Sequence, residues 1–211
     1  MAAELVFYTH PMSRGRIVRW MLEELGIAYR TELLELGAAM KAPDYLAINP
    51  MGKVPAVVHG DQVLTETAAI CVYLADVFPA AGLAPPIEQR GDYYRWLFFA
   101  AGPFEAAIAN RGLGFEVPQE NQRSIGYGSF DLVVDTLERI VASRPFIAGE
   151  SFSAADVYVG SQIGFGLQFG MIDKRAGFEG YWERLSMRDA YLRAQEIDAA
   201  AAESMTQDSH P

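Results

Sequence analysis

The stretch Gly52-Lys53-Val54-Pro55-Ala56-Val57-Val58, followed eleven residues after the proline by Glu66-Thr67, decides how this chain folds. Pro55 has no N–H, so it belongs at the start or the edge of a strand. The bond before a proline is cis in roughly one in twenty cases in folded proteins. A cis bond here would turn the N–H and C=O of Val54 outward, free to pair with an extended peptide.

Glu66-Thr67 opens an apolar helix over residues 66–78. The first N–H groups of a helix have no partner within the helix, and they favour an anion. Together with the outward-facing main chain expected at Val54, this helix start predicts a receptor for a small peptide that carries a free carboxylate.

The first third of the chain alternates strands and helices. Apolar runs predict strands, and apolar residues at helical spacing predict helices. Gly26 ends the first helix, and Gly60-Asp61-Gln62 is a hairpin turn. The expected order is strand 5–9, helix 14–25, strand 29–34, a short helix 38–47, the hairpin 54–59 and 63–64, and helix 66–78.

The rest of the chain reads as helices only. Residues 80–87 are rich in Ala and Pro and form a linker between an N-terminal domain, 1–79, and a helical domain, 88–211. A first helix, 88–110, should kink at Pro103, and a second should run from Pro118 to about residue 142. Ser153 and Asp156 form a capping box that starts a third helix. A last helix is expected over 179–197, with residues 199–211 fraying.

Composition excludes several classes of protein. The 211 residues carry a net charge of −10, so nonspecific nucleic-acid binding is not expected. No apolar run reaches the length of a membrane span, and the single cysteine, Cys71, rules out an internal disulfide framework and fits the cytoplasm. The three histidines have no ligand spacing, so no metal site is expected. Cys71 lies among apolar residues and is interpreted as a buried structural thiol.

The chain resembles a cytosolic glutathione transferase over residues 4–197. Three motifs carry the resemblance: Asn49-Pro50-Met51-Gly52-Lys53-Val54-Pro55, Glu66-Thr67 and the Ser153–Asp156 capping box. The segment from Tyr8 to Gly26 is most similar to bacterial members with a serine-type N-terminal motif. The resemblance implies a thioredoxin-like α/β N-terminal domain followed by an all-α C-terminal domain, usually in a homodimer.

The resemblance also implies how glutathione binds. Val54, beside cis-Pro55, would pair its main chain with the cysteinyl part, and Glu66 and Thr67 would hold the γ-glutamyl end. Lys53 would pair with the glycyl carboxylate. Plainer alternatives stand beside each role: Val54-Pro55 as a strand entry, Thr65 or Thr67 as a helix cap, and Lys53 as a surface lysine.

Conjugation needs a thiolate near neutral pH, which a hydroxyl donor can stabilise. Ser13 lies just before the first helix and is the best-placed hydroxyl, with Thr9, Tyr8 and His10 as rivals. The alternative is that Ser13 only caps this helix. Arg14 and Arg16 would raise the potential around an anionic ligand or else form a solvated helix face.

The electrophile is expected to bind between the domains, against a wall of apolar residues and one arginine: Met12, Phe104, Ile108, Arg111 and Phe115. Apolar residues at helical spacing also fit a plain core. The predicted function is a detoxifying enzyme that joins the glutathione thiolate to small hydrophobic electrophiles. Two alternatives remain: a glutathione-dependent peroxidase, disulfide reductase or isomerase on the same fold, and a non-catalytic interaction protein.

Overall fold

The computed structural model describes residues 3–208. The chain forms two compact units. The first unit contains the residues up to Ala81 together with those from Arg188 onward, and the second contains Gly82–Met187. The boundary near Ala81 falls inside the predicted linker 80–87. The last helix groups with the N-terminal unit, whereas the sequence placed residues 88–211 in one helical domain.

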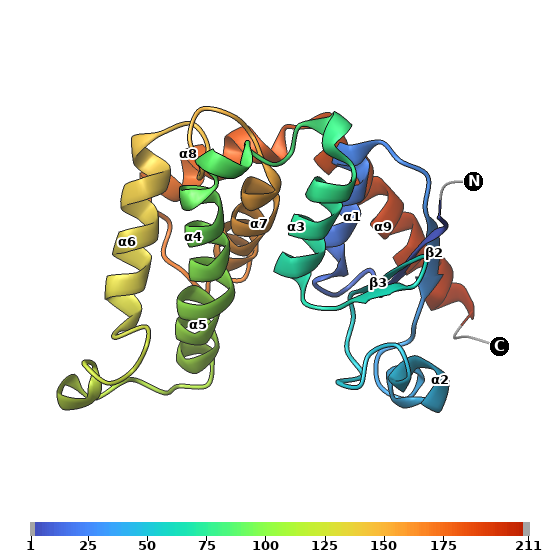
Figure 1. Ribbon diagram of the computed structural model, residues 1–211. Helices are drawn as coiled ribbons and strands as arrows, with labels where there is room; N and C mark the ends of the chain where they lie inside the picture. The colour runs from blue at the N-terminus through green and yellow to red at the C-terminus, as the bar shows by residue number, and fades with distance from the viewer. Residues whose placement is uncertain (1–2, 209–211) are drawn as a thin grey trace. The chain divides into compact units, whose positions relative to one another are not determined.

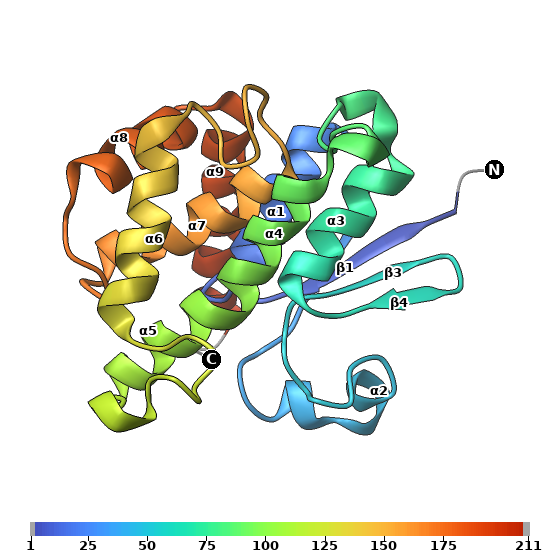
Figure 2. The ribbon, with the colours of Figure 1, turned by 60° about the vertical axis from the view of Figure 1, so that its left-hand side comes forward.

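The first unit is built on a four-stranded sheet in the order β2-β1-β3-β4. Strand β1 (Leu5–Thr9) pairs parallel with β2 (Arg30–Leu33) and antiparallel with β3 (Ala56–His59), which forms a hairpin with β4 (Gln62–Leu64). Helices α1 (Gly15–Leu25) and α3 (Thr67–Val77) pack beside one another and cover the sheet (Figure 2). Between β2 and β3 lie the short 3₁₀ helix η1 (Ala39–Lys41) and α2 (Pro43–Leu46). The predicted order of elements is confirmed.

The C-terminal helix α9 (Asp189–Asp208) runs along α1 (Figure 1). A buried ion pair joins the two helices: Arg19 Nε donates to Asp198 Oδ1 at 3.2 Å, and the side chains are 2% and 3% exposed. Burial raises the pKa of Asp198, and Arg19 opposes that rise. Arg188, just before the first residue of α9, donates two hydrogen bonds to the Glu24 carboxylate, from Nε at 2.6 Å and from Nη2 at 2.8 Å.

The second unit is a helical bundle (Figure 2). Helix α4 (Gly91–Phe99) continues through a π-helical segment, η4 (Ala100–Phe104), into α5 (Glu105–Gly112). Pro103 lies in the π-helical segment, where the missing N–H of a proline is accommodated, and the kink at this residue stays a prediction. Helices α6 (Phe130–Ser143), α7 (Ala154–Gln168) and α8 (Ala176–Ser186) complete the unit, together with the short 3₁₀ turns η3 (Ile87–Gln89) and η5 (Gln119–Asn121). Another 3₁₀ turn, η2 (Pro79–Ala81), ends the first segment of the first unit.

Helix α7 forms the centre of this unit, and the predicted capping box is present at its start. Asp156 is fully buried and accepts from the Ser153 N–H and hydroxyl, the Ile147 N–H and the Tyr181 hydroxyl. Burial raises the pKa of Asp156, and the hydrogen bonds from these four donors oppose part of that rise. Since a buried carboxylate without partners is costly, this set of bonds ties the start of α7 to its neighbours.

Three expectations about helix boundaries are wrong. Helix α6 begins at Phe130 and not at Pro118, because Gly128 has a left-handed φ of +70° that a right-handed helix cannot include, and Ser129 then caps the helix through the Leu132 N–H. The predicted helix 179–197 is two helices that separate at Met187. The tail stays helical to Asp208 because alanines favour the helix and α9 packs on α1. Residues 209–211 lie outside the described part of the chain.

Substitution by alanine should change the stability of the protein in opposite directions at two glycines of the second unit. At Gly164, on α7, an added Cβ would lie 2.6 Å from the Trp182 ring, while at Gly180, on α8, it would meet open space. We expect Gly164→Ala to lower the free energy of unfolding by about 1 kcal/mol, because crowding outweighs the helical gain. Gly180→Ala should raise it by about 0.5–1 kcal/mol. Urea unfolding of both variants checks the pair, and equal shifts would contradict the packing described.

Candidate functional site

The loop before β3 is held by side chains of α2 and of the residues after it. Asn49 Nδ2 and the Tyr45 hydroxyl both donate to the Lys53 C=O, each at 2.7 Å, and both side chains are buried. The Asn49 Oδ1 accepts the Met51 N–H at 3.0 Å. These bonds fix the backbone from which Lys53 and Val54 extend.

Gly52 is required in this loop for two reasons. Its φ of +57° is left-handed, and an added Cβ would lie 2.5 Å from the Met40 C=O and 2.7 Å from Lys41 Nζ. The Lys41 ammonium donates to the Met51 and Gly52 carbonyls at 2.8 and 3.1 Å. Sequence reasoning used Asn49 and Gly52 only as marks of a motif and missed Tyr45 and Lys41. The glycine within an Asn-Pro-x-Gly run was the available signal for a tight turn.

The Val54–Pro55 bond is cis, as the resemblance implied. The ladders of β3 begin at Ala56, so Val54 lies outside the sheet. Within residues 3–208 the Val54 N–H and C=O form no hydrogen bond, although its side chain packs on the cluster of Met40, Tyr45 and Ala56. The main chain of Val54 therefore has a free donor and a free acceptor next to the end of β1.

The start of α3 is strained and uncapped. Glu66 has φ +64° and ψ 110°, and among residues 3–208 it is the one non-glycine with a positive φ. No side chain caps this helix within the described residues, so capping by Thr65 or Thr67 is not seen. The first bond of the helix is from the Ile70 N–H to the Glu66 C=O at 2.9 Å, which leaves the preceding N–H groups for an anion.

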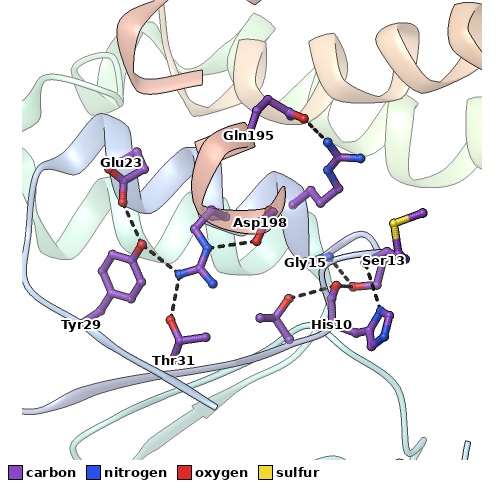
Figure 3. A network of polar contacts seen from close by, with 12 residues as sticks. His10, Ser13, Gly15, Glu23, Tyr29, Thr31, Gln195 and Asp198 are labelled. Carbon is purple, nitrogen blue, oxygen red and sulfur yellow. Dashed lines mark hydrogen bonds and ion pairs between the residues drawn. The ribbon is translucent and has the colours of Figure 1, made fainter. Parts of the chain in front are cut away.

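The turn from β1 to α1 carries Ser13, the hydroxyl that the sequence favoured for the sulfur (Figure 3). The Ser13 hydroxyl donates to the His10 C=O at 2.6 Å and accepts the Gly15 N–H at 3.0 Å. Ser13 therefore does bond the first residue of α1, as the capping alternative proposed, and its oxygen stays half-buried at the helix start. Donation to a sulfur would require this hydroxyl to leave the His10 carbonyl.

The three rivals of Ser13 have other surroundings. Thr9 is 0% exposed and lies against Gly15, so its hydroxyl does not face a ligand. Tyr8 packs its ring on Tyr45, with 5.8 Å between ring centroids. The His10 Nδ1 accepts the Met12 N–H at 3.0 Å. Ser13 is thus the hydroxyl of this turn that solvent can reach at the start of α1.

The basic cluster of α1 divides into three environments. Arg14 is exposed, whereas Arg16 is half-buried and donates to Gln195 of α9. The Arg19 guanidinium is buried and paired with the Asp198 carboxylate. Its Nη1 donates to the hydroxyl oxygens of Tyr29 and Thr31 (Figure 3). Because the Arg19 charge is paired with Asp198, Arg14 and Arg16 stay the candidates for raising the electrostatic potential around an anionic ligand.

The five residues predicted for the electrophile wall are dispersed over both units. Met12 is 68% exposed in the first unit, where it lines a cavity with residues of α9. In the second unit Phe104 is 1% exposed and packs in the core, and Ile108 is half-buried. Arg111 and Phe115 line one cavity of about 210 Å³, in which the Arg111 guanidinium lies over the Phe130 ring at 4.0 Å.

Cys71 is fully buried on α3, and burial raises the pKa of its thiol to about 12. This thiol is therefore protonated and shielded at neutral pH, which makes it a poor nucleophile. Residues 3–208 contain no group of three or more histidine, cysteine or acidic side chains that could hold a metal ion. None of the helices in that range is long and apolar enough to cross a membrane.

Comparison with known proteins points to one family. The profile described as "Glutathione S-transferase, N-terminal domain" matches residues 12–77. Glutathione S-transferase F10 of Arabidopsis thaliana is 28% identical over an alignment of 193 positions, and the match covers 81% of this chain and 86% of the relative. The tetrachloro-p-hydroquinone reductive dehalogenase of Sphingobium chlorophenolicum is 25% identical and covers 91% of this chain and 96% of the relative.

Solved structures agree with the sequence relatives. A crystal structure of a glutathione transferase homologue from Sulfitobacter, with bound glutathione, superposes with a TM-score of 0.74 at 26% identity. The match covers 92% of this chain and 98% of that one. A thioredoxin-like unit and a helical unit in one chain are thus the fold of this family.

The strain at Glu66 can be measured by two substitutions at one position. We expect Glu66→Gly to unfold with a free energy about 1 kcal/mol higher than Glu66→Ala, because glycine tolerates the positive φ that alanine does not. Both variants lose the same carboxylate, so the difference isolates the backbone. Urea unfolding of the two gives the value, and a Glu66→Ala variant at least as stable as Glu66→Gly would mean that the backbone here is relaxed.

Proposed function

Because the chain belongs to the glutathione transferase family, we propose that it joins the thiolate of glutathione to small hydrophobic electrophiles. One observation carries the proposal: the free main chain of Val54 and the uncapped, strained start of α3 occur in the same compact unit as the Ser13 hydroxyl. An acidic tripeptide with a thiol needs an extended-chain partner, an anion site and a thiolate stabiliser, and this unit has a candidate for each.

We assign the glutathione contacts as follows. The cysteinyl part pairs its N–H and C=O with those of Val54, beside Pro55. The γ-glutamyl carboxylate binds at the first N–H groups of α3 and the Thr67 hydroxyl, and the Glu66 carboxylate meets the γ-glutamyl ammonium. The Lys53 side chain is exposed, and its backbone C=O is held by the Asn49 side chain. The Lys53 ammonium pairs with the glycyl carboxylate.

Ser13 then acts on the sulfur. A free thiol has a pKa near 8.5, and lowering it by about two units takes roughly 2.7 kcal/mol. One charge-assisted hydrogen bond contributes about 1.5–3 kcal/mol, so a Ser13 hydroxyl turned from the His10 C=O to the sulfur meets most of that requirement. The thiolate attacks the carbon that bears a leaving group: the C–S bond forms, the bond to the leaving anion breaks, and the thiol proton has gone to water.

A second candidate is glutathione-dependent reduction, which the likeness to a reductive dehalogenase favours. The single cysteine of the chain is buried with a raised thiol pKa, so a reductive cycle here would run on glutathione thiols alone. Peroxidase, isomerase and non-catalytic roles on the same fold have no particular residue in their favour.

We further propose a cytoplasmic homodimer with a detoxifying role. Tyr94 and Phe98 lie one turn apart on α4 and expose 38% and 73% of their surface. Large apolar side chains exposed together on one helix face suit contact with a second copy of the chain. The net charge of −10 disfavours nucleic acid as a partner.

Binding and turnover test the function directly. Glutathione at millimolar concentration should raise the melting temperature, because a ligand that binds only the folded state stabilises it. The protein should then conjugate chlorodinitrobenzene, followed by absorbance of the thioether. A melting temperature unmoved by glutathione would reject the binding site. Binding without conjugation, but with reduction of a small disulfide or cumene hydroperoxide, would favour the second candidate.

Ser13→Ala tests the source of the thiolate. Loss of one hydrogen bond to sulfur should raise the apparent pKa in the kcat/KM profile by one to two units and slow conjugation at pH 6.5 by about 10- to 100-fold. The deficit should shrink as pH rises, because the thiol then ionises unaided. Ser143→Ala is a matched control, since that hydroxyl bonds only its own helix. An unchanged pH profile in Ser13→Ala would mean that Ser13 does not stabilise the thiolate, and Tyr8 and His10 would be tested next.

A further inference from the structure

The segment that joins α5 to α6 borders a cavity of about 210 Å³, which lies wholly within the second unit (Figure 1). Its lining combines charged side chains with aromatic rings. The charged residues are Arg111, Glu116 and Asp131, and the rings include those of Phe115 and Phe130. The contacts proposed for glutathione all belong to the first unit, so this cavity is a separate candidate site.

The charges of the lining are opposite in sign and do not pair with one another. The Arg111 guanidinium lies over the Phe130 ring, 4.0 Å from its centroid. Within residues 3–208, Arg111 forms no ion pair with Glu116 or Asp131, although all three line the same cavity. Stacking uses the face of the guanidinium, so the N–H groups at its edge remain available to a carboxylate. The cavity thus holds a partner for a negative group and, apart from it, partners for a positive group.

The rest of the lining presents apolar surface and one hydroxyl. Ala107 of α5 is 1% exposed and gives the cavity an apolar wall, while Phe115 is 52% exposed and has a ring face that a ligand can reach. A second ring packed on such a face gains more than the buried area alone provides. The Tyr127 hydroxyl accepts the Asn110 Nδ2 hydrogen at 2.8 Å, which leaves its own proton to donate to a ligand.

We propose that this cavity binds a small zwitterion that carries an aromatic ring, of which a free aromatic α-amino acid is the simplest example. The ligand carboxylate pairs with the edge of the Arg111 guanidinium, and the ring packs on Phe115. The ammonium pairs with the carboxylates of Glu116 and Asp131. Since the volume is below the usual range of small-molecule sites, the cavity takes one ring and not a tripeptide.

A zwitterion fits this lining better than a ligand with one charge. An anion that reaches Arg111 also brings its charge near two carboxylates, and a cation that reaches the carboxylates meets the arginine. Arg111, Glu116 and Asp131 are exposed, so water screens each ion pair and each contributes modestly. Both charges and the ring are therefore needed together, and we expect a Kd of about 0.1–1 mM for L-phenylalanine.

Binding to the wild-type protein gives the first test. S-methylglutathione is added at saturating concentration, so that the proposed glutathione site is occupied. L-phenylalanine should then shift amide signals within residues 111–131 in ¹H–¹⁵N NMR spectra and leave those of Lys53 and Val54 unmoved. Shifts that spare residues 111–131 would overturn the proposal.

Three relatives of the ligand each remove one feature. 3-Phenylpropanoate lacks the ammonium, phenethylamine lacks the carboxylate, and glycine lacks the ring. Each should bind at least about threefold more weakly than L-phenylalanine, which is the size expected for one exposed ion pair or one ring contact. Equal affinities for L-phenylalanine and either singly charged relative would overturn the recognition of a zwitterion.

Arg111→Gln tests the carboxylate partner. The variant should weaken binding of L-phenylalanine and of 3-phenylpropanoate by about three- to fivefold and should not weaken binding of phenethylamine. Arg139→Gln is the matched control, because it removes the same charge from an exposed position of α6 outside the cavity and should change none of the three Kd values. An unaltered Kd for L-phenylalanine in Arg111→Gln would overturn the assignment.

The acidic side of the cavity should give the reverse pattern. Glu116→Gln combined with Asp131→Asn should weaken L-phenylalanine and phenethylamine by about three- to fivefold and tighten 3-phenylpropanoate. Glu120→Gln removes an exposed carboxylate of the same segment outside the cavity and should change nothing. Equal weakening of all three ligands would overturn recognition by charge, provided that the melting temperature shows the variant to be folded; Arg111→Gln decides the matter if it is not. No measurement here uses glutathione turnover, so failure of the proposed function would leave the result intact.

Discussion

The close contact between Thr9 and Gly15 is the constraint on which the site depends. A Cβ at position 15 would collide with the Thr9 hydroxyl, so only glycine lets α1 start against the end of β1. That approach forces His10–Arg14 into a tight turn, in which the Ser13 oxygen bridges the His10 C=O and the Gly15 N–H. The same turn directs His10 and Met12 toward α9. One missing methyl group thus positions both the activating hydroxyl and one wall of the cavity that Met12 shares with α9.

The groups proposed to bind glutathione are those that the fold leaves unsatisfied. Folded chains pair nearly all their buried polar main-chain groups, and exposed ones are free to meet a ligand. The Asn49 and Tyr45 side chains donate to the C=O of Lys53 and so fix the backbone that leads into Val54. The N–H and C=O of Val54 itself have no partner among residues 3–208. The strain at Glu66 costs about 1–3 kcal/mol, which persists because the hairpin and α3 fix both of its ends.

Sequence patterns predicted the elements whose signals are local. The strand 5–9, the hairpin at Gly60, the stop at Gly26 and the capping box at Ser153 each depend on a few neighbouring residues. The cis bond at Pro55 was implied by the resemblance, since the local sequence alone gives it a chance of about one in twenty. Patterns failed where distant contacts decide. Nothing within residues 199–208 indicates that α1 will hold them as a helix, and nothing near Thr9 indicates that its hydroxyl faces inward. Arg111 and Asp131 line one cavity only in the folded unit, so no spacing could predict that they share it.

The buried Arg19–Asp198 pair fixes the register of α9 along α1 more than it adds to the stability of the fold. Replacing buried ion pairs by apolar residues is often neutral or stabilising, because desolvation offsets the attraction. Among residues 3–208, one carboxylate oxygen of Asp198 has no hydrogen-bond partner, and burial raises the pKa of this carboxyl. Both observations indicate that the attraction to Arg19 offsets only part of the desolvation cost. Sliding α9 by one turn along α1 would nevertheless leave the Arg19 charge buried without a counter-charge, at a penalty of several kcal/mol. The pair therefore selects one alignment of α9, and that alignment determines which side chains of the helix face the turn after β1.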